Sequence, residues 1–243
     1  SFDFAYVTTF GIFSLFFNDV PLMGQFKNLK KELAKLTADS KSFTKEEAAD
    51  AIKEALSNGI EKGVSLVSKP DGYFENPLIK IPFPPEADEI ESAVRKLPGG
   101  NQKCNEVIWA INRSAELASK EALAIFLIAI KQMSLTDAIS IVKGEEDSAT
   151  KYLEDTTTEE LIIKFKPIIE DALSKTGATK YWGDVMNLYN KIPFVKKINP
   201  DLTDYSTRSA TGGLFEMIAQ EERNIRSNNN FRTSDLLKKV FGS

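Results

Sequence analysis

Apolar residues recur with a helical period along almost the whole chain from Gln25 onward, and no run shows the sustained alternation of a β-strand. In the stretch that begins at Lys45, for example, Ala48, Ile52 and Leu56 follow one another at intervals of four and share one helix face. The pattern predicts an all-α fold. We expect a single domain of roughly nine to eleven helices over residues 25–243, preceded by an apolar segment over residues 1–24.

Local signals set the expected ends of several helices. Ser134 is an N-cap candidate for a short helix, Asp201 begins a long one that extends to about Arg226, and Gly177 ends another. Pro98-Gly99-Gly100 is a firm break.

Two features concern the middle helices. We predict one helix from Asp147 or Ser148 to about Glu154, and a second from Thr157 or Thr158 with a kink at Pro167. The unbroken apolar run from Ala122 to Ile130 predicts a helix that is buried on most sides at the centre of the domain.

A proline-rich segment, Lys69–Pro85, interrupts the helices; we call it the strap. Its prolines limit its flexibility, and the apolar residues between them predict that it lies across a helix surface instead of forming a free linker. The aromatic residues of the strap are candidate ligand or partner contacts: Tyr73, Phe74 and Phe83.

The first residues of the chain are strongly apolar and aromatic, with the sequence FDFAYVTTFGIFSLFF over residues 2–17. This run is shorter than the roughly 20 residues of a typical bilayer span, and no basic region precedes it. We expect the segment to be covered by the domain, by a partner or a second copy of the chain, or by lipid. Its candidate contact residues are Phe10, Phe13, Phe16 and Phe17.

The composition excludes several kinds of chemistry. The chain has no histidine and only one cysteine, Cys104. It therefore lacks most of the side chains that enzymes use for nucleophilic and transition-metal catalysis. We interpret Cys104 as a packing or surface thiol. The net charge of −4 offers no basic face to nucleic acid. No metal or cofactor is predicted, whereas a bound apolar small molecule is compatible with this composition.

One polar cluster is the best candidate for a site. Asn112, Arg113 and Glu116 lie within about one helical turn of each other, beside the most apolar helix. They could line a pocket or pair with late carboxylates such as Glu216. A structural network of ion pairs and hydrogen bonds is the favoured interpretation, because buried charges need partners whether or not there is catalysis. The alternative is a metal-independent hydrolase that uses carboxylates around Glu116.

A second apparent motif is that of a serine–lysine hydrolase. Ser42-Phe43-Thr44-Lys45 matches S-x-x-K, and Lys175-Thr176-Gly177 matches K-T-G. However, S-x-x-K occurs twice more in the chain, and the K-T-G match lies at a predicted helix end where the motif requires a strand. We therefore do not expect this chemistry.

Four segments, in order, carry a family resemblance: the strap, Ala110-Ile-Asn-Arg-Ser-Ala-Glu, Ala129-Ile-Lys-Gln-Met-Ser, and Arg232-Thr-Ser-Asp-Leu-Leu-Lys-Lys-Val-Phe. Over about residues 43–242 the chain resembles the bacterial family known as domain of unknown function 4197. The resemblance implies an exported protein of the periplasm, cell envelope or extracellular space, although residues 1–24 differ from the cleavable leader of that family. It implies no activity and no functional residues.

Together these features favour a non-enzymatic helical binding protein. The expected partners are an apolar ligand, a lipid surface, or a protein partner or second copy bound through the N-terminal segment.

Overall fold

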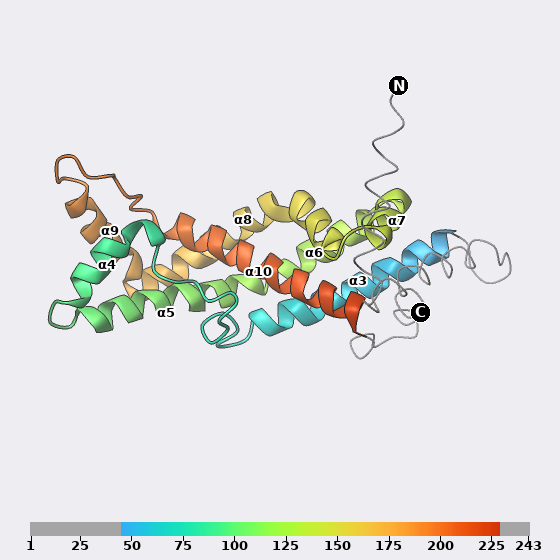
Figure 1. Cartoon of the computed structure of the whole chain (residues 1–243), viewed down its shortest axis with the longest axis horizontal. Coiled ribbons are helices and arrows are strands. Elements are labelled where there is room, and N and C mark those ends of the chain that lie inside the picture. The colour runs from blue at the N-terminus through green and yellow to red at the C-terminus, as the bar shows by residue number, and fades with distance from the viewer. Residues whose placement is uncertain (1–44, 229–243) are drawn as a thin grey trace, which may run out of the picture.

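The computed structural model describes residues 45–228, which form a rod of helices with no strand in that range (Figure 1). The described part contains eight α-helices and one 3-10 turn: α3 (Lys45–Val67), η1 (Pro85–Ala87), α4 (Asp88–Arg95), α5 (Gly100–Ser119), α6 (Ala122–Gln132), α7 (Leu135–Lys143), α8 (Ser148–Thr176), α9 (Ala178–Tyr189) and α10 (Leu202–Ser227). The predicted all-α class is confirmed. Within the described range, the number of helices is slightly below the prediction.

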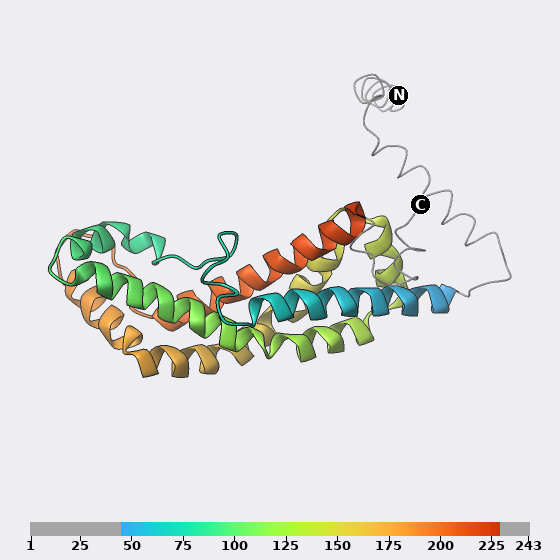
Figure 2. The same cartoon turned by 90° about the horizontal axis from the view of Figure 1, so that it is seen from below.

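The helices run mostly along the rod, so that its two ends are built from different elements (Figures 1 and 2). α4 and α9 lie at one end, and α3 and α7 reach the other. α8 packs against α5, α6, α9 and α10, while α3 packs against α6, α7 and α10. One large hydrophobic core therefore joins both halves of the rod, with a small second cluster beside α7.

The core is centred on α5, α8 and α10, so the prediction that the helix over 122–130 lies at the centre of the domain is wrong. Most of its residues are buried or half-buried, as predicted. α6 is amphipathic: Ile125 and Phe126 are buried, but Ile128 is 51% exposed. α6 covers α3 and α8 from one side, and no described helix lies over its outer face. An apolar run predicts burial of a helix but does not say how many neighbours it has.

The helix boundary predicted near Thr157 is wrong, because α8 continues without interruption from Ser148 to Thr176. Thr156, Thr157 and Thr158 each donate their hydroxyl hydrogen to the carbonyl four residues earlier, at distances of 2.7, 2.5 and 2.6 Å. These hydroxyls are satisfied inside a helix and do not cap a new one. Pro167 is accommodated within the same helix.

Several other predicted ends are confirmed. Ser134 caps α7 in a reciprocal arrangement with Asp137, and the Asp201 side chain accepts a hydrogen bond from the Asp204 N–H at the start of α10. Gly99 and Gly177 adopt φ angles of 75° and 73° at the predicted breaks, a region that favours glycine.

Some predictions concern residues outside the described range. These are the N-terminal contacts Phe10, Phe13, Phe16 and Phe17, the division of the chain at residue 24, and the S-x-x-K serine Ser42. Among the described residues, no single helix has the length and apolar composition of a membrane span. α6 and α7 meet those criteria only as a pair bent by 110°.

Candidate functional site

The strap crosses the rod between α5 and α10, as the sequence predicts, and its apolar side chains enter the core. Tyr73 is fully buried and Phe83 is 4% exposed, whereas Phe74 is half-buried and Leu78 points outward. Phe83 packs edge-on against Trp182, with ring centroids 5.2 Å apart. Tyr73 and Phe83 are therefore core residues in this state. A ligand or partner could reach them only if the strap left its place.

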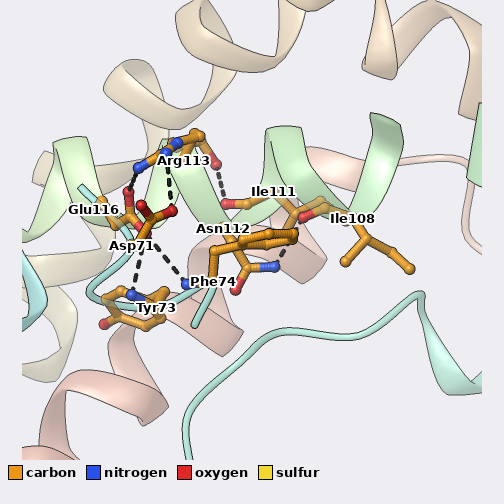
Figure 3. A network of polar contacts seen from close by, with 9 residues as sticks. Asp71, Tyr73, Phe74, Ile108, Ile111, Asn112, Arg113 and Glu116 are labelled. Atoms are coloured by element: carbon orange, nitrogen blue, oxygen red, sulfur yellow. Dashed lines mark hydrogen bonds and ion pairs between the residues drawn. The ribbon is translucent and has the colours of Figure 1, made fainter. Parts of the chain in front are cut away.

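Glu116 ties the strap to α5 (Figure 3). One oxygen of its carboxylate accepts the backbone N–H groups of Tyr73 and Phe74, at 3.1 and 3.2 Å, and the other accepts Arg113 at 2.7 Å. Arg113 also reaches Asp71, at 2.9 Å. Asp71 has a φ of 65° in the turn that begins the strap. The buried charge of Glu116 is thus neutralised and fully bonded, which is the condition for a buried carboxylate to be tolerated.

Asn112 fixes the strap one turn earlier on α5. Its side-chain oxygen accepts the Ile81 N–H at 2.9 Å, and its amide nitrogen donates to the Ile81 carbonyl at 2.8 Å. The same nitrogen also donates to the Ile108 carbonyl. Asn112 is fully buried, so these bonds satisfy backbone groups of the strap that no helix or sheet supplies with partners.

The strap is also held on its other side by α10. The Tyr73 hydroxyl donates to the Ala210 carbonyl at 2.7 Å, and the Tyr205 hydroxyl donates to the Pro82 carbonyl at 3.2 Å. Gly213 lies where the Tyr73 ring meets α10, and a Cβ atom there would stand 2.8 Å from the ring. The close approach of strap and helix requires glycine at this position.

Adjacent glycines on α10 give a matched test of this packing. Gly213→Ala is expected to destabilise the protein by about 1–2 kcal/mol, because the new methyl group overlaps a ring that cannot swing away. Gly212→Ala should stabilise it by about 0.5–1 kcal/mol, since alanine favours helix and nothing lies within 4 Å of the added atom. Urea unfolding of both variants measures the difference; two changes of the same sign would show that the strap does not pack here.

Burial gives Tyr73 a role in alkaline stability. Desolvation, together with the nearby charge of Glu116, raises the pKa of Tyr73 above its ordinary 10.0. From about pH 10 upward the unfolded chain ionises this tyrosine while the folded chain keeps it neutral. The ionisation of Tyr73 in the unfolded chain should therefore lower the free energy of unfolding by up to about 1.4 kcal/mol per pH unit. Unfolding measured against pH should show a shallower fall for Tyr73→Phe, and an unchanged slope would contradict this assignment.

The carboxylates of α10 form separate contacts, and the pairing with them that the sequence offered for the Asn112, Arg113 and Glu116 cluster does not occur among the described residues. Glu216 pairs with Arg223 and Glu221 with Lys62. Glu222 accepts the N–H groups of Ala149 and Thr150, both at 2.9 Å, at the first turn of α8. A carboxylate at that position satisfies unpaired helix donors and matches the helix dipole. Glu222 therefore caps α8 from another helix.

A small apolar cavity lies between α3, α8 and α10, with Leu56, Leu153 and Ile218 in its wall and Glu221 and Glu222 at its edge. Its volume is about 30 Å³, room for roughly two waters. Small-molecule sites are typically about 300–1,000 Å³. The cavity is too small to enclose an organic ligand.

Other chemical groups offer no further centre in the described part. Cys104 is buried among core residues, and burial raises the pKa of its thiol, which suits packing and not nucleophilic attack. Lys175, Thr176 and Gly177 form the end of α8, so the K-T-G match lacks its strand. No group of three or more acidic or cysteine side chains within residues 45–228 is arranged to hold a metal ion.

The structure thus places Asn112 and the Arg113–Glu116 pair one turn apart on α5, where both hold the strap, and leaves Glu216 in contact with Arg223. Sequence reasoning missed Asp71 and the cap made by Glu222. The Pro-Asp-Gly turn that begins the strap was the available signal for Asp71, because aspartate is favoured at such turns. No local signal marks Glu222, since its partners lie at the start of a distant helix.

Fold and site together define an all-helical bundle protein in which buried polar side chains hold a strap across the core. The chain belongs to the family described as Protein of unknown function (DUF4197), whose model matches residues 42–242. No curated protein and no solved structure matches the chain. Two of the segments that carry the resemblance, the strap and the Ala110–Glu116 stretch, are the ones that hydrogen-bond to each other.

Proposed function

We propose that this protein is a non-enzymatic helical module whose outer surface binds a lipid surface or a protein partner. The observation that carries the proposal is where its apolar side chains lie. Eight large ones in the described part are exposed, among them Trp109, Leu117 and Phe194, while the cavity between α3, α8 and α10 has room only for water-sized molecules. Two of the eight, Ile192 and Phe194, stand together in one loop, and apolar groups gathered in this way favour contact with another surface.

The polar cluster supports the same view. A hydrolase built on Glu116 needs a carboxylate that can meet a water molecule and a substrate. Both oxygens of Glu116 already accept hydrogen bonds, and the side chain is almost completely buried. Asn112 is occupied in the same way. These bonds favour a structural role for the candidate residues.

The apolar-ligand version of the proposal has less support, because the cavity between α3, α8 and α10 is too small for such a molecule. Location in the periplasm, envelope or extracellular space, implied by the family resemblance, is part of the proposal. So is contact of the N-terminal segment with a partner or second copy.

Native mass spectrometry of the purified full chain, first under gentle and then under denaturing conditions, tests the proposal. We expect the mass of the chain or of a whole-number assembly, with nothing released on denaturation. A small molecule that appears only after denaturation would overturn surface binding in favour of a carrier. The number of subunits in the gentle spectrum reports on self-contact.

A further inference from the structure

The loop that joins α9 to α10 carries the most exposed apolar residue of the described chain (Figure 1). Phe194 is 106% exposed and Ile192 is 52% exposed, with the exposed Pro193 between them. A single exposed aliphatic residue on a protein surface needs no explanation, but an apolar tip with a fully exposed aromatic ring indicates a contact site.

Hydrogen bonds hold the two ends of this loop in place, so the position of its tip is defined. The Asn190 side chain donates to the Ile198 carbonyl at 2.7 Å and accepts the Ile198 N–H at 2.9 Å. Ile198 itself is buried, and the Trp182 ring N–H donates to the neighbouring Asn199 carbonyl at 3.3 Å. The two ends of the loop are thereby held together, as in a compact surface loop with its own internal bonds.

The backbone at the tip is strained. Phe194 has a φ of 66°, in a region where a bulky side chain is a genuine outlier that costs about 1–3 kcal/mol. Because the exposed ring gains no core packing in return, stability does not explain the residue. Strain of this kind is typical of sites that present a side chain for function.

Three lysines flank the apolar tip: Lys191 on one side, and Lys196 and Lys197 on the other. All three are exposed, and none forms an ion pair with any residue in the range 45–228. An apolar tip with basic flanks is complementary to an anionic membrane, because the ring enters the acyl boundary while the ammonium groups meet lipid phosphates. The net charge of −4 gives no overall attraction to such a surface, so the loop must supply it locally.

We propose that the α9–α10 loop docks this protein on an anionic phospholipid surface. The turn between α4 and α5 lies at the same end of the rod (Figures 1 and 2). It contains Leu97, which is 61% exposed and provides a second apolar contact. The inference rests on the proposed surface-binding function and names the surface. The protein then stands with the α4 and α9 end toward the lipid.

Flotation with lipid vesicles tests this docking on the full chain. Wild-type protein should float with vesicles of phosphatidylcholine and phosphatidylglycerol, and much less with phosphatidylcholine alone. Phe194→Ser should weaken the apparent affinity for the anionic vesicles about tenfold. Replacing Lys191, Lys196 and Lys197 with glutamine should weaken it about a hundredfold.

Matched variants elsewhere on the surface serve as controls. Ile163→Ser removes a side chain that is 71% exposed on α8. Glutamine at Lys120, Lys164 and Lys166 changes the net charge as much as the loop variant does. Both controls should bind like wild type.

The proposal is overturned if the loop variants still float as wild type does, if the lysine controls lose binding equally, or if wild type floats with neither vesicle. If the wild-type protein does not float, lipid docking by this loop is wrong, but the broader proposal of surface binding is not affected. That broader proposal is overturned by a different result, the release of a ligand in the native mass spectrum.

Discussion

Replacing Glu116 with alanine is expected to lower the free energy of unfolding by about 3–5 kcal/mol. The substitution leaves the N–H groups of Tyr73 and Phe74 without acceptors inside the protein. It also removes the closer of the two carboxylates that Arg113 contacts. Arg113 remains 28% exposed and keeps Asp71, so its contribution to the loss is smaller than that of a fully buried charge. Chemical denaturation followed by circular dichroism measures the change.

Glu116→Gln separates the structural role from a catalytic one. The amide oxygen can still accept both N–H groups, so we expect a loss of only about 1–2 kcal/mol, from the missing charge. The matched control is Glu106→Gln, which breaks the exposed pair that Lys103 and Glu106 form at the same i,i+3 spacing on the same helix. It should leave unfolding unchanged within error. Equal effects at the two sites would contradict the role of Glu116 as the anchor of the strap.

The second large effect is expected at Glu222, where alanine should cost about 3–4 kcal/mol. Its carboxylate accepts three hydrogen bonds from the first turn of α8, including the Thr150 hydroxyl at 2.8 Å. It also pairs with Arg226, at 2.8 Å. The Asp147 side chain, in the N-cap position of α8, makes no capping hydrogen bond, so no local group replaces the one that is lost.

Glu216→Ala is the control for Glu222, because it removes another glutamate–arginine pair from the same helix. The side chains of Glu216 and Arg223 are 44% and 35% exposed, and such pairs contribute about 0–1 kcal/mol. Glu222→Ala should therefore melt at a clearly lower temperature than Glu216→Ala in thermal unfolding. If Glu222→Ala melts at the same temperature as Glu216→Ala, then α8 does not depend on this cap.

The helix ends that could be predicted are those specified by neighbouring residues. The Ser134 cap, the Asp201 cap and the break at Gly177 depend only on a few residues around each position. The predicted boundary at Thr157 is wrong because a threonine hydroxyl can either cap a new helix or donate to a carbonyl inside a continuing one. Thr157 does the second, and the local sequence does not distinguish the two cases. The position of α6 depends on which helices cover it, which its own apolar run does not encode.

The candidate site shows a similar division. Helical spacing alone predicts that Asn112 and Glu116 lie near each other on α5. Their partners, however, are backbone groups of Tyr73, Phe74 and Ile81, and a backbone N–H or carbonyl has no sequence signature. Exposure of Phe194 was likewise hidden, because an apolar residue in a loop is compatible with either burial or exposure. Only the packing of the chain distinguishes these cases.

Hydrogen–deuterium exchange of the strap in the full chain tests most directly whether the interior stays closed, which binding through the surface requires. The amides of Tyr73, Phe74 and Ile81 are bonded to buried side chains of α5. We predict that they exchange as slowly as the core amides of that helix, in a single global opening. Fast local exchange of these three amides would mean that the strap leaves its place and exposes Tyr73 and Phe83, and it would contradict a closed, surface-binding module.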